Sequence, residues 1–256
     1  MMLRCLDDVH EYSRLLEKDR AEQERLLHDL LIGVTEFFRD PLAFQFLYDS
    51  TMENMFEGRN DGEVRIWSAA CATGEEAYSL AIMAKEASER FGFGGTITVF
   101  ATDLHRSSLE TASLGIYTND KLRNVSDERL ESNFHKEDGC YRVNDSIRKM
   151  IVFAPQNLIT DPPLARIDLV SCRNMLIYLR PRIQDRVITS FQHCLREGGT
   201  LFLGSSEALG RPSSEFEVVN ATFKVFRRSK DVFPHAVPSP IGIGPHHSDL
   251  PPAAEN

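Results

Sequence analysis

From residue 63 to about residue 228, short continuous apolar runs alternate with longer segments whose apolar residues recur at helical spacing. Strands that are apolar throughout are typical of a parallel sheet, because helices cover both faces of such a sheet. No other feature of the sequence restricts the fold as strongly. It predicts one α/β domain over residues 63–228, with strands near residues 64–70, 96–102, 150–154, 167–171 and 200–204 and an antiparallel pair near 216–219 and 223–227.

Helices are expected between these strands, over residues 75–90, 107–114 and 182–195. The last of them should be ended by Gly198 and Gly199. Between residues 115 and 148 the alternation weakens, which indicates a small insertion. Within it we expect a helical piece over residues 126–134, a turn at 138–139 and a short strand over 141–143.

The two ends of the chain differ from this core. Residues 1–57 contain amphipathic segments that predict a helical N-terminal region, and its last helix should span residues 41–56. Asp40 is a suitable N-cap for that helix, and Pro41 a suitable first residue. Residues 229–256 are crowded with Pro and His and hold too few large apolar groups to offset their ordering entropy. We expect a disordered tail or a linker there.

Charge and composition disfavour several classes of function. The chain carries 29 Lys and Arg against 38 Asp and Glu, a formal net charge of -9, and no basic block suited to nucleic acid. No apolar run approaches the roughly 20 residues that span a bilayer. The five cysteines are scattered without a CxxC pair, so neither disulfides nor a metal site is indicated. We expect a cytoplasmic protein with reduced thiols that neither binds nucleic acid nor inserts into a membrane.

Ligands of open α/β sheets bind beyond the carboxyl ends of the strands, so the residues that follow each strand are the candidates. The first such segment, residues 67–76 (WSAACATGEE), joins small residues and one glycine to two acids at a helix start. Small side chains let a ligand approach the backbone. Glu75 and Glu76 would repel a pyrophosphate and suit a cationic ligand such as a sulfonium. The alternative is that both acids only favour the helix dipole.

Two further segments place polar side chains after strands. Asp103 lies 29 residues beyond Gly74, the approximate spacing at which a carboxylate binds ribose hydroxyls in α/β cofactor folds. Alternatively, it only caps the next helix. Residues 172–178 (CRNMLIY) follow another strand, and an arginine and a tyrosine near one cleft can orient a carboxylate. Taken alone, Tyr178 is better explained as a core aromatic than as a site residue, because it follows Met-Leu-Ile.

Taken together, these segments resemble the chemotaxis receptor methyltransferase family of the CheR type. The resemblance extends from about residue 31 to residue 227, most of the chain. Five motifs in order carry it, and chance does not readily explain all five: VTEFFRD at 34–40, WSAACATGEEAYS at 67–79, FATD at 100–103, FAPQNL at 153–158 and CRNMLIY at 172–178.

The resemblance implies a class I S-adenosylmethionine-dependent methyltransferase: a Rossmann-like α/β fold with a mostly parallel sheet, a short N-terminal helical region and a small β-subdomain inserted over residues 115–148. The methyl donor would be S-adenosylmethionine and the product S-adenosylhomocysteine. Arg39 near the sulfonium and Tyr178 facing the methyl group are the implied catalytic residues. The residues implied to hold the cofactor are Thr35, Arg39, Ala70 through its carbonyl, Glu76 at the methionine end, Asp103 at the ribose, Asn157 and Leu158 beside the adenine, and Cys172 and Arg173 along the cleft.

The implied activity is methylation of glutamate side chains on the cytoplasmic domain of a chemoreceptor or related signalling protein, giving methyl esters. Gly33 stands where the family often has Asn, and the N-terminal region is short. Both features favour an alternative, a non-catalytic module that senses S-adenosylmethionine within a signalling protein. The loop at residues 135–140 looks shorter than in members that dock on a receptor's C-terminal pentapeptide, so we expect no such tether. Several stretches resemble methyltransferase domains fused within larger signalling proteins.

Overall fold

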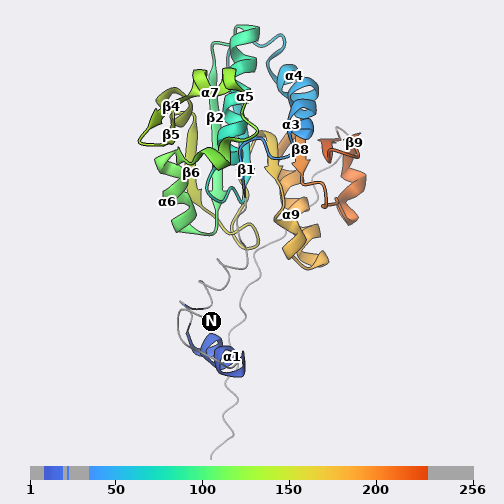
Figure 1. Cartoon of the computed structure of the whole chain (residues 1–256). Helices are drawn as coiled ribbons and strands as arrows, with labels where there is room; N and C mark the ends of the chain where they lie inside the picture. The colour runs from blue at the N-terminus through green and yellow to red at the C-terminus, as the bar shows by residue number, and fades with distance from the viewer. Residues whose placement is uncertain (1–8, 20–21, 23–34, 230–256) are drawn as a thin grey trace, which may run out of the picture.

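The computed structural model describes residues 9–19, 22 and 35–229, which include a central sheet with helices on both faces (Figure 1). α1 (Val9–Lys18) lies in the predicted N-terminal helical region. Residues 1–8, 20–21 and 23–34 of that region, and the predicted tail beyond residue 229, fall outside the described residues. The helix predicted over residues 41–56 is present but not uniform. α3 (Pro41–Leu47), the π-helical η2 (Tyr48–Met52) and α4 (Glu53–Phe56) follow one another without a break.

Within the described residues, one sheet has the strand order β6-β2-β1-β7-β8-β10-β9. Its first five strands are parallel, and the last two are added antiparallel, which confirms the predicted fold class. After β1 the chain builds outward to β2 and β6, then crosses back to β7 on the other side, so a topological switch point lies between β1 and β7. The strands are β1 (Glu63–Ala69), β2 (Thr96–Asp103), β6 (Ile151–Pro155), β7 (Ile167–Cys172), β8 (Leu195–Leu203), β9 (Phe216–Asn220) and β10 (Val225–Arg228).

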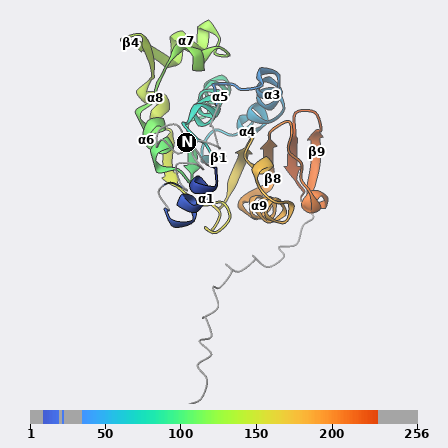
Figure 2. The same ribbon diagram turned by 60° about the horizontal axis from the view of Figure 1, so that its bottom comes forward.

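Neighbouring residues of each central strand enter two different cores. α5 (Glu75–Phe91), α3 and α4 cover the face on which Ile66 and Leu169 are buried. α9 (Pro181–Cys194) covers the other face, with Trp67 and Val170. Figure 2 shows α3 and α5 on one side of β8 and α9 on the other. The continuous apolar runs of the sequence follow from this arrangement, because both faces of these strands are covered.

A second sheet of the described chain is antiparallel, in the order β3-β5-β4, and lies where the sequence indicates an insertion. We call residues 115–148 the inserted subdomain. α6 (Arg106–Leu114) leads into it, on the β6 side of the main sheet and away from β9 (Figure 1). Its elements are β3 (Ile116–Tyr117), η3 (Asn119–Leu122), α7 (Asp127–Asn133), β4 (Phe134–Glu137), β5 (Cys140–Val143) and α8 (Asp145–Arg148).

One local prediction is wrong, and another is confirmed only in part. Gly198 and Gly199 do not end α9, which stops at Cys194 because Leu195 is already extended. Both glycines lie inside β8, near the point where its register with β7 shifts, and Gly198 (φ 73°) fits this irregularity. Asp40 does occupy the N-cap position of α3, with Pro41 as the first helical residue, as predicted. It makes no side-chain capping bond, however, because its backbone is left-handed (φ 62°) and its carboxylate binds Arg173.

Two kinds of feature are absent from residues 9–19, 22 and 35–229. No helix there is both long enough and apolar enough to cross a membrane. No cluster of three or more His, Cys, Asp or Glu side chains there has an arrangement suited to holding a metal ion.

Candidate functional site

The carboxyl ends of β1, β2 and β7 lie side by side at the switch point of the main sheet. The chain leaves β1 through a short loop, residues 70–74, that leads into α5. Ala70 (φ 57°) and Ala72 (φ 48°) both have left-handed backbone, which is uncommon for residues with a Cβ and gathers at functional sites. The loop after β1 therefore combines small side chains with strained backbone.

Asp103, at the end of β2, holds this loop. Its Oδ2 accepts a hydrogen bond from Ala72 N at 2.8 Å, and its Oδ1 accepts one from His105 N at 2.9 Å. The residue is 8% exposed. The N-cap position of α6 belongs to His105, so Asp103 fixes the turn before this helix rather than occupying its cap. It thus joins the loops after β1 and β2, and its contact with a ribose stays a prediction.

An ionic network joins the end of β7 to α5 and to the residues before α3; its arginine is buried, whereas the side chain of Asp40 is 48% exposed. Arg173 has a side chain only 1% exposed; its Nη1 donates to Arg39 O at 3.0 Å and to Glu76 Oε2 at 3.4 Å. Its Nη2 donates to Asp40 Oδ2 at 2.5 Å. Ser171 Oγ donates to Glu76 Oε1 at 2.6 Å. The side chains of Glu76 and Arg173 and the backbone carbonyl of Arg39, three predicted site residues, are therefore brought together.

The two acids at the start of α5 have different surroundings. Burial raises the pKa of Glu76, and the charge of Arg173 and the hydrogen bond from Ser171 oppose this shift. Burial also raises the pKa of Glu75, opposed mainly by its hydrogen bond from Thr73. The Glu75 carboxylate is fully buried: Oε2 accepts from Thr73 Oγ1 at 2.7 Å and Oε1 lies 3.4 Å from Lys121 Nζ. Only Glu76 therefore joins the network beside β7.

Tyr178 lies beyond the end of β7, in the 3-10 turn η4 (Leu176–Tyr178). It is 57% exposed, so its interpretation as a core aromatic is wrong. Leu176, at 1% exposure, occupies the buried position instead. Between Arg173 and this turn, Asn174 adopts left-handed backbone (φ 61°). The chain bends at Asn174, and Tyr178 beyond this bend is open to solvent.

Glu207 is a candidate site residue that sequence reasoning missed. It is 4% exposed, its Oε1 accepts from Met175 N at 2.9 Å and Leu176 N at 2.7 Å, and its Oε2 accepts from Gly204 N at 2.6 Å. These bonds fix the start of the turn that carries Tyr178 against the end of β8. The only signal in the sequence is an acid shortly after an apolar strand, in LGSSE at residues 203–207.

The remaining predicted residues are placed as follows. Cys172 is fully buried in the core on the α9 side and burial raises the pKa of its thiol, so its side chain does not reach the surface. Asn157 Oδ1 accepts from Ile159 N at 2.9 Å in the turn after β6, and Leu158 is partly buried against the same core as Cys172. Thr35 contacts the inserted subdomain through its backbone: its carbonyl oxygen accepts a hydrogen bond from Lys121 Nζ at 2.8 Å.

A recess of about 370 Å³ opens beside the ionic network, between α3 and the ends of β8 and β10. Arg173 and Asp40 form part of its wall, and Leu42, Leu203 and Phe223 supply apolar surface. Leu42 is 74% exposed. The site therefore has a charged, buried part at the switch point and an apolar hollow next to it.

Comparisons with known proteins agree with this architecture. A family model described as CheR methyltransferase, SAM binding domain, matches residues 33–225. The chain is 40% identical over 228 residues to an uncharacterized 104.1 kDa protein of Rhodobacter capsulatus, covering 89% of the chain but only 24% of that protein. It is 35% identical to a chemotaxis protein methyltransferase of Vibrio parahaemolyticus (72% of this chain, 68% of the relative). It is 32% identical to the chemotaxis protein methyltransferase of Escherichia coli K12 (88% and 78%).

Proposed function

Because the chain belongs to the CheR methyltransferase family, whose S-adenosylmethionine-binding domain covers residues 33–225, we propose that it methylates glutamate side chains of a chemoreceptor-like signalling protein. The products are glutamate methyl esters and S-adenosylhomocysteine. The observation that carries the proposal is the arrangement at the end of β7, where the buried Arg173 binds Glu76, Asp40 and the backbone carbonyl of Arg39. The proposed acceptor domain is cytoplasmic, and so is the proposed place of action.

The donor set at the switch point fits the methyl donor. S-adenosylmethionine carries positive charge on its sulfur and its amino group, and Glu76 and Asp103 place two carboxylates at this edge of the sheet. Arg173 Nε and Asn174 Oδ1 are buried polar atoms without a hydrogen-bond partner in the described chain, and such atoms generally have a partner in the functional state. We propose that Glu76 binds the methionine end and Asp103 the ribose.

The reaction needs no general base. The role of the chain's residues is therefore to align the charges of donor and acceptor and to exclude water. A glutamate side chain with an ordinary pKa is already ionised at neutral pH. When bound, the cofactor supplies a methyl group activated by the sulfonium. The acceptor carboxylate loses hydration on entering the cleft, and a fixed cation offsets part of that cost. We propose that Arg39 is this cation, because a planar guanidinium can hold one oxygen and leave the other free. The hydroxyl of Tyr178 would orient the same group.

The surface around the site supports a macromolecular acceptor. Leu42 (74%), Ile177 (46%) and Tyr178 (57%) are large apolar side chains with high exposure near the carboxyl ends of β7 and β8. Contiguous exposed apolar surface marks interaction sites, and these three side chains are our candidates for such a surface. We propose that the acceptor segment lies across η4 and the recess beside α3, and that no C-terminal pentapeptide tether is required.

The direct test is transfer of labelled methyl from S-adenosylmethionine to a purified receptor cytoplasmic domain, scored as base-labile ester. Arg39→Ala should lower turnover by about 100-fold or more, since removing one preorganised donor to a reacting anion typically costs that much. Arg211→Ala is the matched control, because Arg211 is 94% exposed in its side chain and lies in η5 (Arg211–Glu215). If Arg39→Ala kept its turnover within about threefold of wild type, the proposed role of Arg39 as the fixed cation would be wrong. Binding of cofactor without any transfer would favour the sensing module.

A further inference from the structure

The segment that carries Thr35 and Arg39 is held by the inserted subdomain, through Lys121 at the end of η3. Lys121 Nζ donates to Thr35 O at 2.8 Å. The backbone carbonyl of Lys121 accepts from Phe37 N at 3.1 Å. One residue of the subdomain therefore fixes the chain on both sides of Glu36, directly before Arg39.

The same lysine also reaches the head of α5. Its Nζ lies 3.4 Å from Glu75 Oε1, an atom that is buried and has no hydrogen bond in the described part of the chain. Lys121 has a side chain 30% exposed, whereas the Glu75 carboxylate is 1% exposed. A buried carboxylate needs a nearby cation or it is strongly disfavoured in its charged form. Lys121 thus connects residues 35–39 to the helix start that carries Glu76.

Tyr117 of β3 makes a second connection, to the loop after β1. Its hydroxyl donates to Thr73 O at 2.7 Å. The packing there is tight: a Cβ on Gly74 (φ 93°) would lie 3.1 Å from Tyr117 Oη and 2.8 Å from Ala112 Cβ. The ring of Phe37 packs edge-on against Tyr117, with centroids 4.9 Å apart. Tyr117 therefore touches both segments that Lys121 joins.

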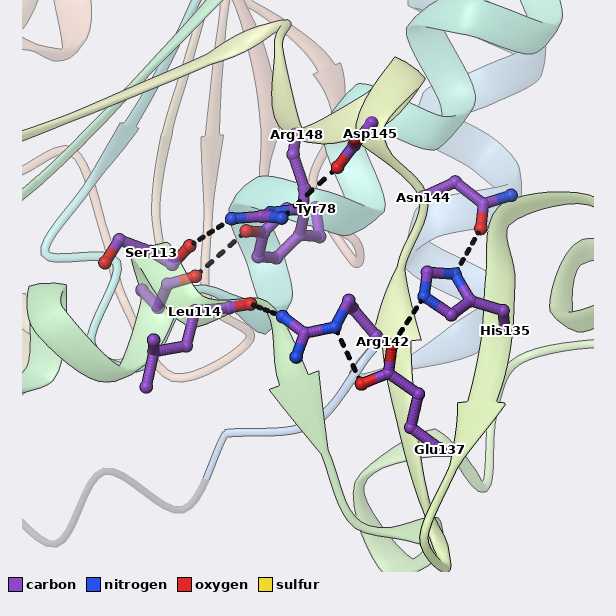
Figure 3. A network of polar contacts seen from close by, with 10 residues as sticks. Tyr78, Ser113, Leu114, His135, Glu137, Arg142, Asn144, Asp145 and Arg148 are labelled. Carbon is purple, nitrogen blue, oxygen red and sulfur yellow. Dashed lines mark hydrogen bonds and ion pairs between the residues drawn. The ribbon is translucent and has the colours of Figure 1, made fainter.

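The opposite side of the subdomain has a different network, drawn in Figure 3. There Arg142 donates to Leu114 O at 3.2 Å and to Glu137 Oε2 at 2.8 Å, and Arg148 donates to Ser113 O at 3.1 Å. These bonds tie the subdomain to the end of α6. They involve none of the predicted cofactor residues, so this side serves as an internal control.

We propose that Lys121 and Tyr117 are positioning residues for the methyl-donor site, through which the inserted subdomain sets the distance between residues 35–39 and the loop and helix start at residues 73–76. The inference rests on the proposed function only in taking these two segments as the walls of the cofactor site. It gives the subdomain a role within the catalytic domain, separate from any docking of a partner.

The test measures the affinity for S-adenosylhomocysteine by calorimetry, which needs no methyl acceptor. Lys121→Met should weaken binding by about tenfold or more, a change of about 1.4 kcal/mol. Lys121→Arg, which keeps the charge and a donor, should restore affinity to within about threefold of wild type. Arg142→Gln, on the control side of the subdomain, should bind as wild type does. Equal affinity of Lys121→Met and wild type would overturn the proposal.

A second pair of variants addresses the hydroxyl bond and covers the case in which Lys121→Met folds poorly. Tyr117→Phe removes the hydroxyl that binds Thr73 O, and Tyr141→Phe removes a hydroxyl from its cross-strand neighbour on β5. Tyr117→Phe should weaken S-adenosylhomocysteine binding by about threefold to tenfold, and Tyr141→Phe should not. An equal effect of the two changes would contradict a positioning role for Tyr117.

The same proteins separate this inference from the proposed function. If wild type binds S-adenosylhomocysteine and the Lys121 and Tyr117 variants lose affinity as described, the positioning role stands even when no receptor glutamate is methylated. If methyl transfer occurs and the variants bind normally, the proposed function stands and the positioning role is wrong.

Discussion

The two ends of the main sheet each hold an acid bound by arginine, yet the surroundings differ. At the carboxyl end, Arg173 is 1% exposed and is shared by Glu76 and Asp40. At the amino end, Asp168 is 2.9 Å from Arg196 and 3.7 Å from Arg59, whose side chains are 29% and 32% exposed. The arginine at the carboxyl end is therefore desolvated, whereas the arginines at the amino end remain partly in water. The acids do not divide in the same way, because Asp40 is 48% exposed and Asp168 only 11%.

The larger of the two cavities does not lie beside the candidate site. The hollow at the amino end has about 480 Å³ and is lined by Arg59, Asp168, Arg196 and Arg227, whereas the recess beside the candidate site has about 370 Å³. Coulomb interactions are strong only where water is excluded. We therefore assign the chemistry to the carboxyl end, where the buried Arg173 is shared by two acids, and regard the larger hollow as a surface feature lined by partly exposed charges.

The largest expected effect comes from removing the central cation of the buried network. Arg173→Met should lower the free energy of unfolding by about 3–5 kcal/mol, because it leaves Glu76 buried without its cation. Arg196→Met at the amino end should cost about 1 kcal/mol or less, as partly exposed pairs do. Urea denaturation of both variants measures the difference. Similar losses for the two would erase the contrast between the ends.

A smaller effect is expected at Glu207, which braces the turn that carries Tyr178. Glu207→Gln puts an amide where a carboxylate accepts three N–H bonds, and should cost about 1–3 kcal/mol of stability. It should also lower methyl transfer more than cofactor affinity, because Asp103 and Glu76 remain. Glu215→Gln, in η5, is the control, since Glu215 has a side-chain bond to Gln192 outside the site. If Glu207→Gln lost cofactor affinity but kept its turnover, Glu207 would not act by bracing the turn that carries Tyr178.

The pH dependence of stability should reflect the buried acids of α5. Burial raises the pKa of Glu76 and of Glu75 above the ordinary value of 4.5. A carboxyl group shifted in this direction contributes stability fully below its unfolded pKa, and the contribution is lost as the pH rises through its folded pKa. Wild type should therefore lose stability relative to Glu76→Gln as the pH rises from 4.5 toward the raised value. Thermal melts across this range check the sign, and a gain of wild type over the variant would contradict it.

The smallest effect is expected at the large hollow. Arg227→Gln changes a lining residue of that cavity and should leave S-adenosylhomocysteine affinity within about twofold of wild type, a difference below about 0.5 kcal/mol. Calorimetric titration of Arg227→Gln with S-adenosylhomocysteine, run alongside the Lys121 variants, measures the difference in affinity. A large loss of S-adenosylhomocysteine affinity in Arg227→Gln would place the cofactor site at the amino end and contradict its assignment to the carboxyl end.

The sequence by itself determined the fold class and the positions of most strands, because apolar periodicity is a local property that parallel strands and amphipathic helices express directly. It also placed Glu76, Asp103 and Arg173 after strands, where the sheet topology gathers ligand-binding residues. It misjudged the ends of elements where a residue has a distant partner. Asp40 has the residue type of an N-cap, but its carboxylate binds Arg173, which lies 133 positions later in the chain.

Only the tertiary structure decided which side chains share a charge and which face water. Tyr178 follows three apolar residues yet is exposed, because Glu207 and the left-handed Asn174 turn the chain there. Lys121 looks like a surface lysine in the sequence, but it joins Thr35 to Glu75. Such contacts depend on the strand order and on the inserted subdomain packing back on α5. Neither the strand order nor this packing produces a local sequence pattern, because the contacting residues meet only when the whole sheet has formed.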